Sequence, residues 1–185
     1  MNRRAPTATF YTIGHSTRPL GEFIELLAAA KVNTLVDVRT VPRSRTNPQF
    51  NAETLPDALG ACGISYRHLP ALGGLRGRRR DGVESPNDFW ENQSFRNYAD
   101  YAGTEAFREG LRTLRAIGEA KTPAIMCAEA VWWRCHRRII ADYLIAAGEA
   151  VFHILSLKKI EPAQLTPAAR PTADGTLIYP KADGG

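Results

Sequence analysis

The chain has 185 residues, of which 44% are hydrophobic and 23% are charged, and this is enough for one domain to bury its own core. No apolar segment is long enough to cross a bilayer or to act as an export signal, so we expect a cytoplasmic protein with no membrane partner. Three cysteines, Cys62, Cys127 and Cys135, are too few for a secreted disulfide framework. The net charge of +5 favours a polyanionic partner, either nucleic acid or a phosphate-bearing small molecule, but a merely basic protein has the same charge.

Short apolar runs bounded by turn residues predict strands, and apolar residues recurring every three or four positions predict helices. The two signals alternate along this chain. Continuous apolar runs are typical of parallel strands that are covered on both faces. In chain order, the predicted elements are a strand over 10–13, a helix over 20–28, a strand over 34–38, a helix over 55–62, a strand over 64–69, one bent helix or two helices over 95–117, a strand over 123–127, a helix over 134–147 and a strand over 150–155.

This alternation predicts an α/β fold, in which a mainly parallel five-stranded sheet carries helices on both faces. We expect the doubly wound, flavodoxin- or Rossmann-like sheet to form a single domain over residues 1–185, with its core at about 8–157. The Pro-containing segment 158–185 is expected to be an irregular C-terminal appendage with a short edge strand at 177–179.

Reactive and polar side chains collect where the predicted strands end. In a parallel sheet, ligands bind beyond the carboxyl ends of the strands. Because strand side chains alternate, Asp37 and Arg39 share one side and can pair, as a structural ion pair or as a clamp for a phosphate or carboxylate. The residues at the strand ends are His15, Ser16, Asp37, Arg39, His68, Cys127 and Glu129.

The densest segment joins the strand that ends at Cys127 to a helix that begins near Cys135. The partial positive charge of a helix start favours a thiolate or a bound anion, and neighbouring arginines add to it. We therefore expect Cys127 or Cys135 to be a nucleophile, with Glu129, His15 or His136 as the proton carrier. Residues expected to bind an anion or to cover this site are Ser16, Arg39, Arg43, Arg137, Trp132 and Trp133.

Several of these residues can instead have purely structural roles in the core. Cys62 lies on the apolar stripe of a short helix and is expected to be a small buried hydrophobe, and His153, inside a strand, a hydrogen-bonded core residue. Cys127 and Cys135 can likewise be core residues. A zinc site of Cys127, Cys135 and His136 would lack the paired ligand spacings of ordinary zinc sites, so we expect no metal and no cofactor.

A glycine-rich basic loop over 72–82 contains the arginines between Arg76 and Arg80. Such a loop can follow a nucleic-acid backbone, and its plainer alternative is a solvated loop. Arg43 and Arg45 form a second basic patch. Aromatic residues that can offer stacking surfaces to bases are Phe50, Trp90, Trp132 and Trp133.

Five separated motifs together resemble the DUF488 family of bacteria and archaea. They are TIGHS at 12–16, DVR at 37–39 followed by Pro42, LGG at 72–74, CAE at 127–129 and CHR at 135–137. The resemblance covers roughly residues 10–155 and implies the fold described above, but no reaction, because the family has no generally established function. The thiol segment is also similar to rhodanese-like and cysteine-phosphatase loops. It departs from their C-x5-R cradle, since six residues, none a glycine, separate Cys127 from Arg134.

Three functional hypotheses follow. The leading one is an enzyme acting on a nucleic acid, nucleotide or other phosphate-bearing substrate, with the Cys, Glu and His residues above in nucleophilic or acid–base roles and Arg39 and Arg137 holding the anion. The second is a non-catalytic nucleic-acid-binding module, in which the basic loop supplies the affinity. The third is a redox or sulfur-handling protein, which requires Cys127 and Cys135 to lie close enough to bridge.

Overall fold

The computed structural model describes residues 8–182 and has a six-stranded sheet at its centre. The strands are β1 (Thr9–Gly14), β2 (Thr34–Asp37), β3 (Ser65–His68), β4 (Pro123–Cys127), β5 (Ala150–Ser156) and β6 (Lys159–Pro162). They lie in the order β3-β2-β4-β1-β5-β6, in which β1 to β5 are parallel and β6 is antiparallel to β5. The predicted α/β class and its five parallel strands are confirmed, and the sheet gains a sixth strand from the segment expected to be irregular.

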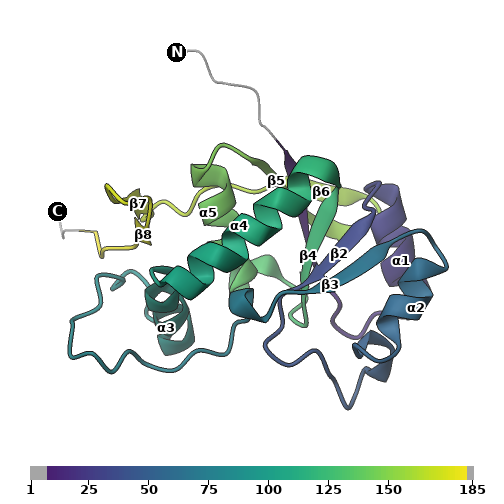
Figure 1. Ribbon diagram of the computed structural model, residues 1–185, viewed down its shortest axis with the longest axis horizontal. Helices are drawn as coiled ribbons and strands as arrows, with labels where there is room; N and C mark the ends of the chain where they lie inside the picture. Colours follow the sequence, from purple (N-terminus) through teal and green to yellow (C-terminus); the bar gives the residue numbers. More distant parts are fainter. Residues whose placement is uncertain (1–7, 183–185) are drawn as a thin grey trace.

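Helices cover both faces of this sheet, as Figure 1 shows. Phe23 and Leu26 of α1 pack with Leu59 of α2 in one apolar cluster, and α3, α4 and α5 contribute to a second cluster on the other face. The predicted helical stretch 95–117 is two helices, because the chain turns at Gly103 and Thr104 accepts a hydrogen bond from the start of the second. The helices are α1 (Leu20–Ala29), α2 (Leu55–Gly60), α3 (Gln93–Ala102), α4 (Glu105–Ala120) and α5 (Arg137–Ala146).

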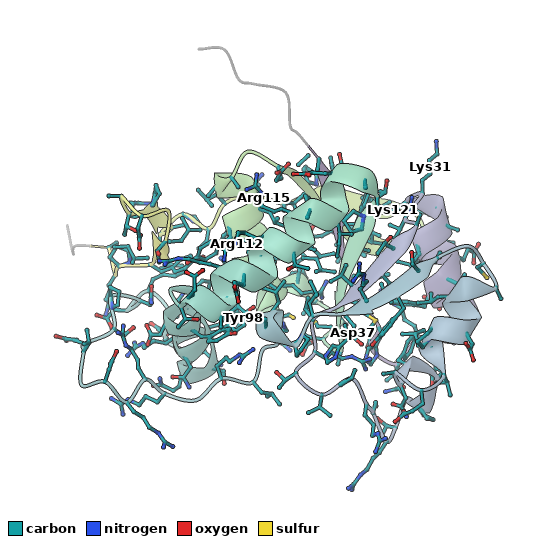
Figure 2. All side chains as sticks on the ribbon, viewed as in Figure 1. Lys31, Asp37, Tyr98, Arg112, Arg115 and Lys121 are labelled. Carbon is teal, nitrogen blue, oxygen red and sulfur yellow. The ribbon has the colours of Figure 1, made fainter. Side chains whose placement is uncertain are left out.

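The burial of the inner strands on both faces explains why their sequences are nearly continuous in apolar residues. Every residue of β2 and of β4 is buried. Ile125 faces the cluster of α3 to α5, and Met126 faces that of α1 and α2, as expected for side chains that alternate between two covered faces. Figure 2 shows the contrast between Asp37, which lies among the strands, and Lys31, which points away from the protein.

The strand order decides which loops meet. Because β4 lies between β1 and β2, the order differs from those of flavodoxin-like and Rossmann sheets. Gly14 pairs with Cys127 and Asp37 with Met126 in the ladder. The backbone N–H of His15 then donates to the Cys127 carbonyl at 3.0 Å, which extends the pairing beyond the strand ends. The ends of β1, β2 and β4 are therefore side by side.

The C-terminal segment is packed against the domain. It forms a small hairpin of β7 (Arg170–Pro171) and β8 (Leu177–Ile178), and Tyr179 is fully buried. The Tyr179 hydroxyl donates to the carboxylate of Asp142 in α5 at 2.9 Å, and the Thr166 N–H donates to the same carboxylate at 2.8 Å. Residues 166–179 thus form a strap across α5, where the sequence predicted an irregular appendage.

Two further expectations have an outcome here. The prediction that Cys62 is buried is wrong, because α2 ends at Gly60 and Cys62 lies exposed in the turn before β3. That turn closes at Gly63, as predicted, with a φ of +74° that favours glycine. Within the described chain, no helix has the length and apolar character needed to cross a bilayer.

Candidate functional site

A cavity of about 490 Å³ lies where the carboxyl ends of β1, β2 and β4 meet. The loop after β3 and the first turn of α3 complete its wall with Gly74, Leu75 and Phe95. Among the predicted site residues, those in the wall are His15, Arg39, Arg43, Cys127, Glu129, Cys135 and His136. The predicted site residues that lie behind or beside the wall are Ser16, Asp37, Trp132, Trp133 and Arg137.

Two glycines allow the loops of the cavity wall to pack closely against their neighbours. A Cβ atom at Gly14 would collide with the carbonyl group of Glu129, so glycine permits the end of β1 to touch the loop after β4. A Cβ atom at Gly74 would lie 2.5 Å from Nδ1 of His136, so this glycine lets the loop after β3 rest on the imidazole ring. The motifs TIGHS and LGG therefore contribute close backbone packing around the cavity.

Cys127 and Cys135 form a dithiol at the bottom of the cavity. Their sulfur atoms are 2.6 Å apart, and the residues are 3% and 5% exposed. Cys127 ends β4, and Cys135 immediately precedes α5, so the eight-residue separation in sequence is closed by one turn of 3-10 helix at Trp132–Arg134. The Cys135 sulfur also accepts the backbone N–H of Arg137, in the first turn of α5, at 3.4 Å. A helix start thus faces the sulfur, as the sequence predicted.

The guanidinium of Arg137 lies behind the dithiol and is buried, since the residue is 1% exposed. Nε donates to the Cys127 sulfur at 3.0 Å, and Nη2 donates to the Glu129 carbonyl at 2.8 Å. Among residues 8–182, no carboxylate forms an ion pair with Arg137, and the two thiols are the groups that raise its pKa against the effect of burial. A buried cation requires a counter-charge. We conclude that the dithiol supplies it as a thiolate.

The two thiols differ in acidity. Burial opposes ionisation of Cys135, but the hydrogen bond from Cys127 and the charge of Arg137 lower the pKa of Cys135 to about 6. Burial raises the pKa of Cys127, and its hydrogen bond to Cys135 raises that pKa further. The pair therefore carries one negative charge near neutral pH, with Cys135 as the thiolate and Cys127 as the thiol that donates to it.

His136 lies next to the thiolate in the cavity wall. Its Nε2 donates to the Val38 carbonyl at 2.9 Å, so Nδ1, which is 3.5 Å from the Cys135 sulfur, carries the lone pair in the neutral ring. Burial lowers the pKa of His136, which keeps the ring neutral at neutral pH. His136 therefore presents an unprotonated ring nitrogen to Cys135, and its role as a proton carrier stays a prediction.

A buried relay connects Arg137 to Trp132. Arg137 Nη1 donates to the Thr12 hydroxyl at 3.0 Å, and this hydroxyl in turn donates to Nδ1 of His153 at 2.7 Å. Burial and the charge of Arg137 lower the pKa of His153 to about 4, so the ring accepts this proton as a neutral imidazole. His153 stacks on the Trp132 ring with centroids 4.5 Å apart. The prediction of a hydrogen-bonded core histidine is confirmed.

The predicted pair of tryptophans lies beside the cavity. Trp132 is half-buried on His153 and donates its Nε1–H to Glu161 at 3.0 Å, while Trp133 is 47% exposed and contacts Trp132 edge to face. Trp90 and Phe50, expected as stacking surfaces for bases, are buried in the core, so that expectation is wrong.

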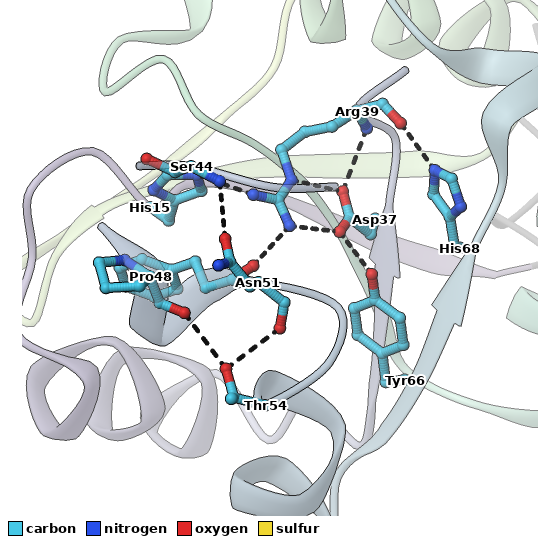
Figure 3. A network of polar contacts seen from close by, with 10 residues as sticks. His15, Asp37, Arg39, Ser44, Pro48, Asn51, Thr54, Tyr66 and His68 are labelled. Carbon is cyan, nitrogen blue, oxygen red and sulfur yellow. Dashed lines mark hydrogen bonds and ion pairs between the residues drawn. The ribbon is translucent and has the colours of Figure 1, made fainter. Parts of the chain in front are cut away.

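Arg39 lies in the opposite wall of the cavity, and Asp37 holds it from behind in a network of polar contacts (Figure 3). Asp37 is fully buried, and Arg39 donates to it through Nε at 2.9 Å and Nη2 at 2.6 Å. The Tyr66 hydroxyl donates to the same carboxylate at 2.6 Å, and the Arg39 carbonyl accepts a hydrogen bond from His68 at 2.8 Å. The predicted pairing is confirmed, and it holds the guanidinium rigidly at the cavity.

His15 lies between this pair and the dithiol. Its Nδ1 donates to the Ser16 carbonyl at 2.8 Å, so Nε2 accepts from Nη1 of Arg39 at 3.3 Å. Burial lowers the pKa of His15, and its ring stacks on Phe50. The φ of Ser16 is +48°, an uncommon value for a residue other than glycine, and it turns the chain from β1 around the cavity.

Glu129 contributes its backbone to the site, and its predicted role as a proton carrier stays a prediction. Its side chain is exposed at the cavity, and its backbone carbonyl is the group that contacts Arg137 and the thiol of Cys127. In the described part of the chain, no three His, Cys, Asp or Glu side chains converge as a metal site.

The basic loop is partly fixed by the domain. Arg76 lies 3.7 Å from the centre of the Tyr101 ring and donates to the carbonyls of Pro70 and Gly73. Arg79 pairs with Asp81. A second hollow beside this loop combines arginines with acids, and the charged residues in its wall are Arg78, Arg79, Arg80, Arg96, Glu84, Asp88 and Asp100.

Residues missed by the sequence analysis are Thr12, as a link between Arg137 and His153, and Tyr66, as a second residue that donates to Asp37. Thr12 is a polar residue inside a buried strand, which is a signal for a hydrogen-bonded role. Tyr66 gives no such signal, because a tyrosine in an edge strand is ordinary.

Fold and cavity together define a doubly wound α/β protein with a buried dithiol–arginine site at its strand ends. The chain belongs to the DUF488 family: the sequence model of this domain of unknown function matches residues 19–144. Comparisons with curated proteins and with solved structures gave no match. The matched region contains Asp37, Arg39 and the whole dithiol segment, whereas His15 lies just before it.

Proposed function

We propose that the protein is a dithiol oxidoreductase, in which Cys135 is the attacking thiolate and Cys127 the resolving thiol. The observation that carries this proposal is the pair of sulfurs, which lie 2.6 Å apart beside a buried arginine and open on a cavity. A low-pKa thiol next to a second thiol is the arrangement that exchanges disulfides through a mixed-disulfide intermediate.

The reaction is a two-electron exchange with a small disulfide. The Cys135 thiolate attacks one sulfur of the substrate RS–SR, forming Cys135–S–SR and releasing RS⁻. Cys127 then loses its proton to the released RS⁻ or to water, and its sulfur attacks that of Cys135. A second RS⁻ leaves, and the cysteines are joined in a disulfide. The substrate is reduced to two thiols, and two equivalents of an external thiol restore the pair and leave as a disulfide.

The geometry favours this hypothesis over the other two. A phosphoryl or acyl transfer would use Cys135 but would give Cys127 no chemical role, whereas dithiol exchange uses both. The nucleic-acid hypothesis depended on the arginines of the basic loop, which here lie beside Asp81, Glu84, Asp88 and Asp100. Those acids offset the positive charge that a phosphate backbone requires.

The test counts thiols in a Cys62→Ser background, because the exposed Cys62 would react with any disulfide. Reduced protein is mixed with dithiodipyridine, and the released thiopyridone and the protein mass are measured. We expect two equivalents released and a protein lighter by two hydrogens, with no adduct. Cys127→Ser in the same background should stop at one equivalent and retain the adduct.

Two results would contradict the proposal. Two retained adducts in the Cys62→Ser protein would mean that the sulfurs do not pair in solution. A dithiol that stays unreactive until the protein is unfolded would rule out thiol chemistry in the cavity, since buried structural cysteines are inert. The variant Cys135→Ser provides the matched control, because with one buried thiol left it can release one equivalent at most and form no internal disulfide.

A further inference from the structure

We infer that the substrate of the dithiol is a small organic disulfide that carries an anionic group on an apolar or aromatic body. This inference rests on the proposed function and identifies its substrate class. The cavity of about 490 Å³ is within the usual range of small-molecule sites, roughly 300–1,000 Å³.

The anionic group is recognised by Arg39. Nε and Nη2 of this guanidinium are occupied by Asp37 and by the Phe50 carbonyl, and Nη1 donates one N–H to His15. Nη1 has two N–H groups, and among residues 8–182 no hydrogen bond uses the second one, while Arg39 itself forms part of the cavity wall. The residue is 6% exposed, so this donor is an incompletely used polar group on a rigid, buried side chain. A carboxylate or phosphate oxygen would satisfy it.

The charges around the cavity also favour a negatively charged substrate. Arg43 and Arg134 also line the cavity, and Glu129 is the one acid among the described residues of its wall. Arg43 is exposed and paired with Glu53, and Arg134 is the exposed last residue of the 3-10 turn between the two cysteines. Arg134 therefore adds mobile positive charge at the mouth, which attracts an anion toward the fixed donor of Arg39.

The body of the substrate is recognised by an apolar rim. Val41 and Leu75 are 59% and 76% exposed, and both belong to the cavity wall, although they come from different loops. Phe95 of α3 completes this side. Two large exposed aliphatic side chains facing one cavity lose contact with water when an apolar body enters between them.

The experiment compares four disulfides that differ in charge and in ring content. They are dithiobis(nitrobenzoate), dithiodipyridine, dithiodipropionate and cystamine, and each rate with the Cys62→Ser protein is divided by the rate with free mercaptoethanol. We expect normalised rates to be highest for the aromatic dicarboxylate and lowest for the cationic cystamine. Benzoate, which cannot react, should slow the reaction with dithiodipyridine by competition.

Variants separate the two recognition elements. The double variant Asp37→Asn and Arg39→Gln removes both charges of the buried pair. It should lower the ratio of anionic to neutral rates about tenfold, which corresponds to the loss of one hydrogen bond to a charged group. Arg134→Gln changes an exposed residue and should lower the same anionic-to-neutral ratio about threefold. Leu75→Ser should lower the aromatic-to-aliphatic ratio about threefold. Arg80→Gln and Val83→Ser make the same changes outside this cavity and should alter neither ratio.

The outcomes distinguish the two proposals. If the dithiol reacts with all four disulfides at equal normalised rates, or if Arg134→Gln and benzoate have no effect, the substrate class is wrong while the dithiol activity stands. If the folded protein forms no internal disulfide with any of them, the dithiol activity itself is refuted.

Discussion

Arg137 should set the reduction potential of the dithiol. In the reduced protein its guanidinium is balanced by the thiolate, whereas a disulfide between Cys127 and Cys135 would leave it buried with no counter-charge. Breaking a buried ion pair by removing one partner costs about 3–5 kcal/mol. Since about 1.4 kcal/mol corresponds to 30 mV for a two-electron couple, the disulfide should be roughly 60–110 mV more oxidising than it would be without the cation.

The variant Arg137→Met removes the charge and keeps most of the side chain's length. We expect its potential to fall by that amount, so that its disulfide is harder to reduce. The assay equilibrates the Cys62→Ser protein with glutathione buffers of graded ratio, traps free thiols by alkylation and measures the oxidised fraction by mass. Arg138→Met is the matched control, because Arg138 donates to Thr166 and contacts no thiol.

An unchanged or higher potential in a folded Arg137→Met protein would refute the reasoning, because it would mean that the guanidinium does not favour the reduced state. Thermal unfolding of both redox forms verifies that the variant is folded. Arg137→Lys provides a second measurement: it retains the charge but loses the planar fork, so its potential should fall by less than that of Arg137→Met.

Three further predictions concern acidity, packing and the C-terminal strap. Alkylation of Cys135 should reach its full rate above a midpoint near pH 6 and slow below it, since the lowered pKa keeps the reactive thiolate until the pH falls through that value; a midpoint near 8.5 would contradict this. Gly14→Ala should destabilise the protein by about 1–3 kcal/mol in urea unfolding, because its methyl group meets a backbone carbonyl, whereas Gly21→Ala has open space and should not destabilise it. Tyr179→Phe should cost about 1–3 kcal/mol, because the buried Asp142 carboxylate loses a hydrogen bond; an unchanged urea midpoint would show that water replaces the hydroxyl.

The fold was predictable where local sequence and tertiary environment agree. Residues 123–127 form a continuously apolar run and are the strand β4 as predicted, because both faces of that strand are covered. Lys159–Pro162 has no such pattern and becomes β6 through its pairing with β5. A strand that depends on its neighbour in this way is recognised from the sheet and not from its own residues.

The site was predictable as a set of residues but not as a geometry. Cys127 and Cys135 were candidates because they end a strand and precede a helix, yet their distance depends on the turn at Trp132–Arg134. The position of β4 between β1 and β2 brings His15 and Arg39 to the same cavity. No local sequence pattern predicts this strand order. Side-chain alternation does predict the pairing of Asp37 with Arg39 within one strand end, and that prediction is confirmed.

The strap over α5 has a consequence for shortened chains. Tyr179 binds Asp142 through its hydroxyl, and its backbone N–H and carbonyl bind Asn87 and Phe89 in the segment before α3. α5 carries the thiol segment at its start, and α3 carries Phe95 of the cavity wall. A nonsense codon that removed Tyr179 would therefore release both helices from one anchor. Mutations more than forty residues from the nearest cysteine would then behave, in a genetic screen, as loss-of-function alleles of the thiol site.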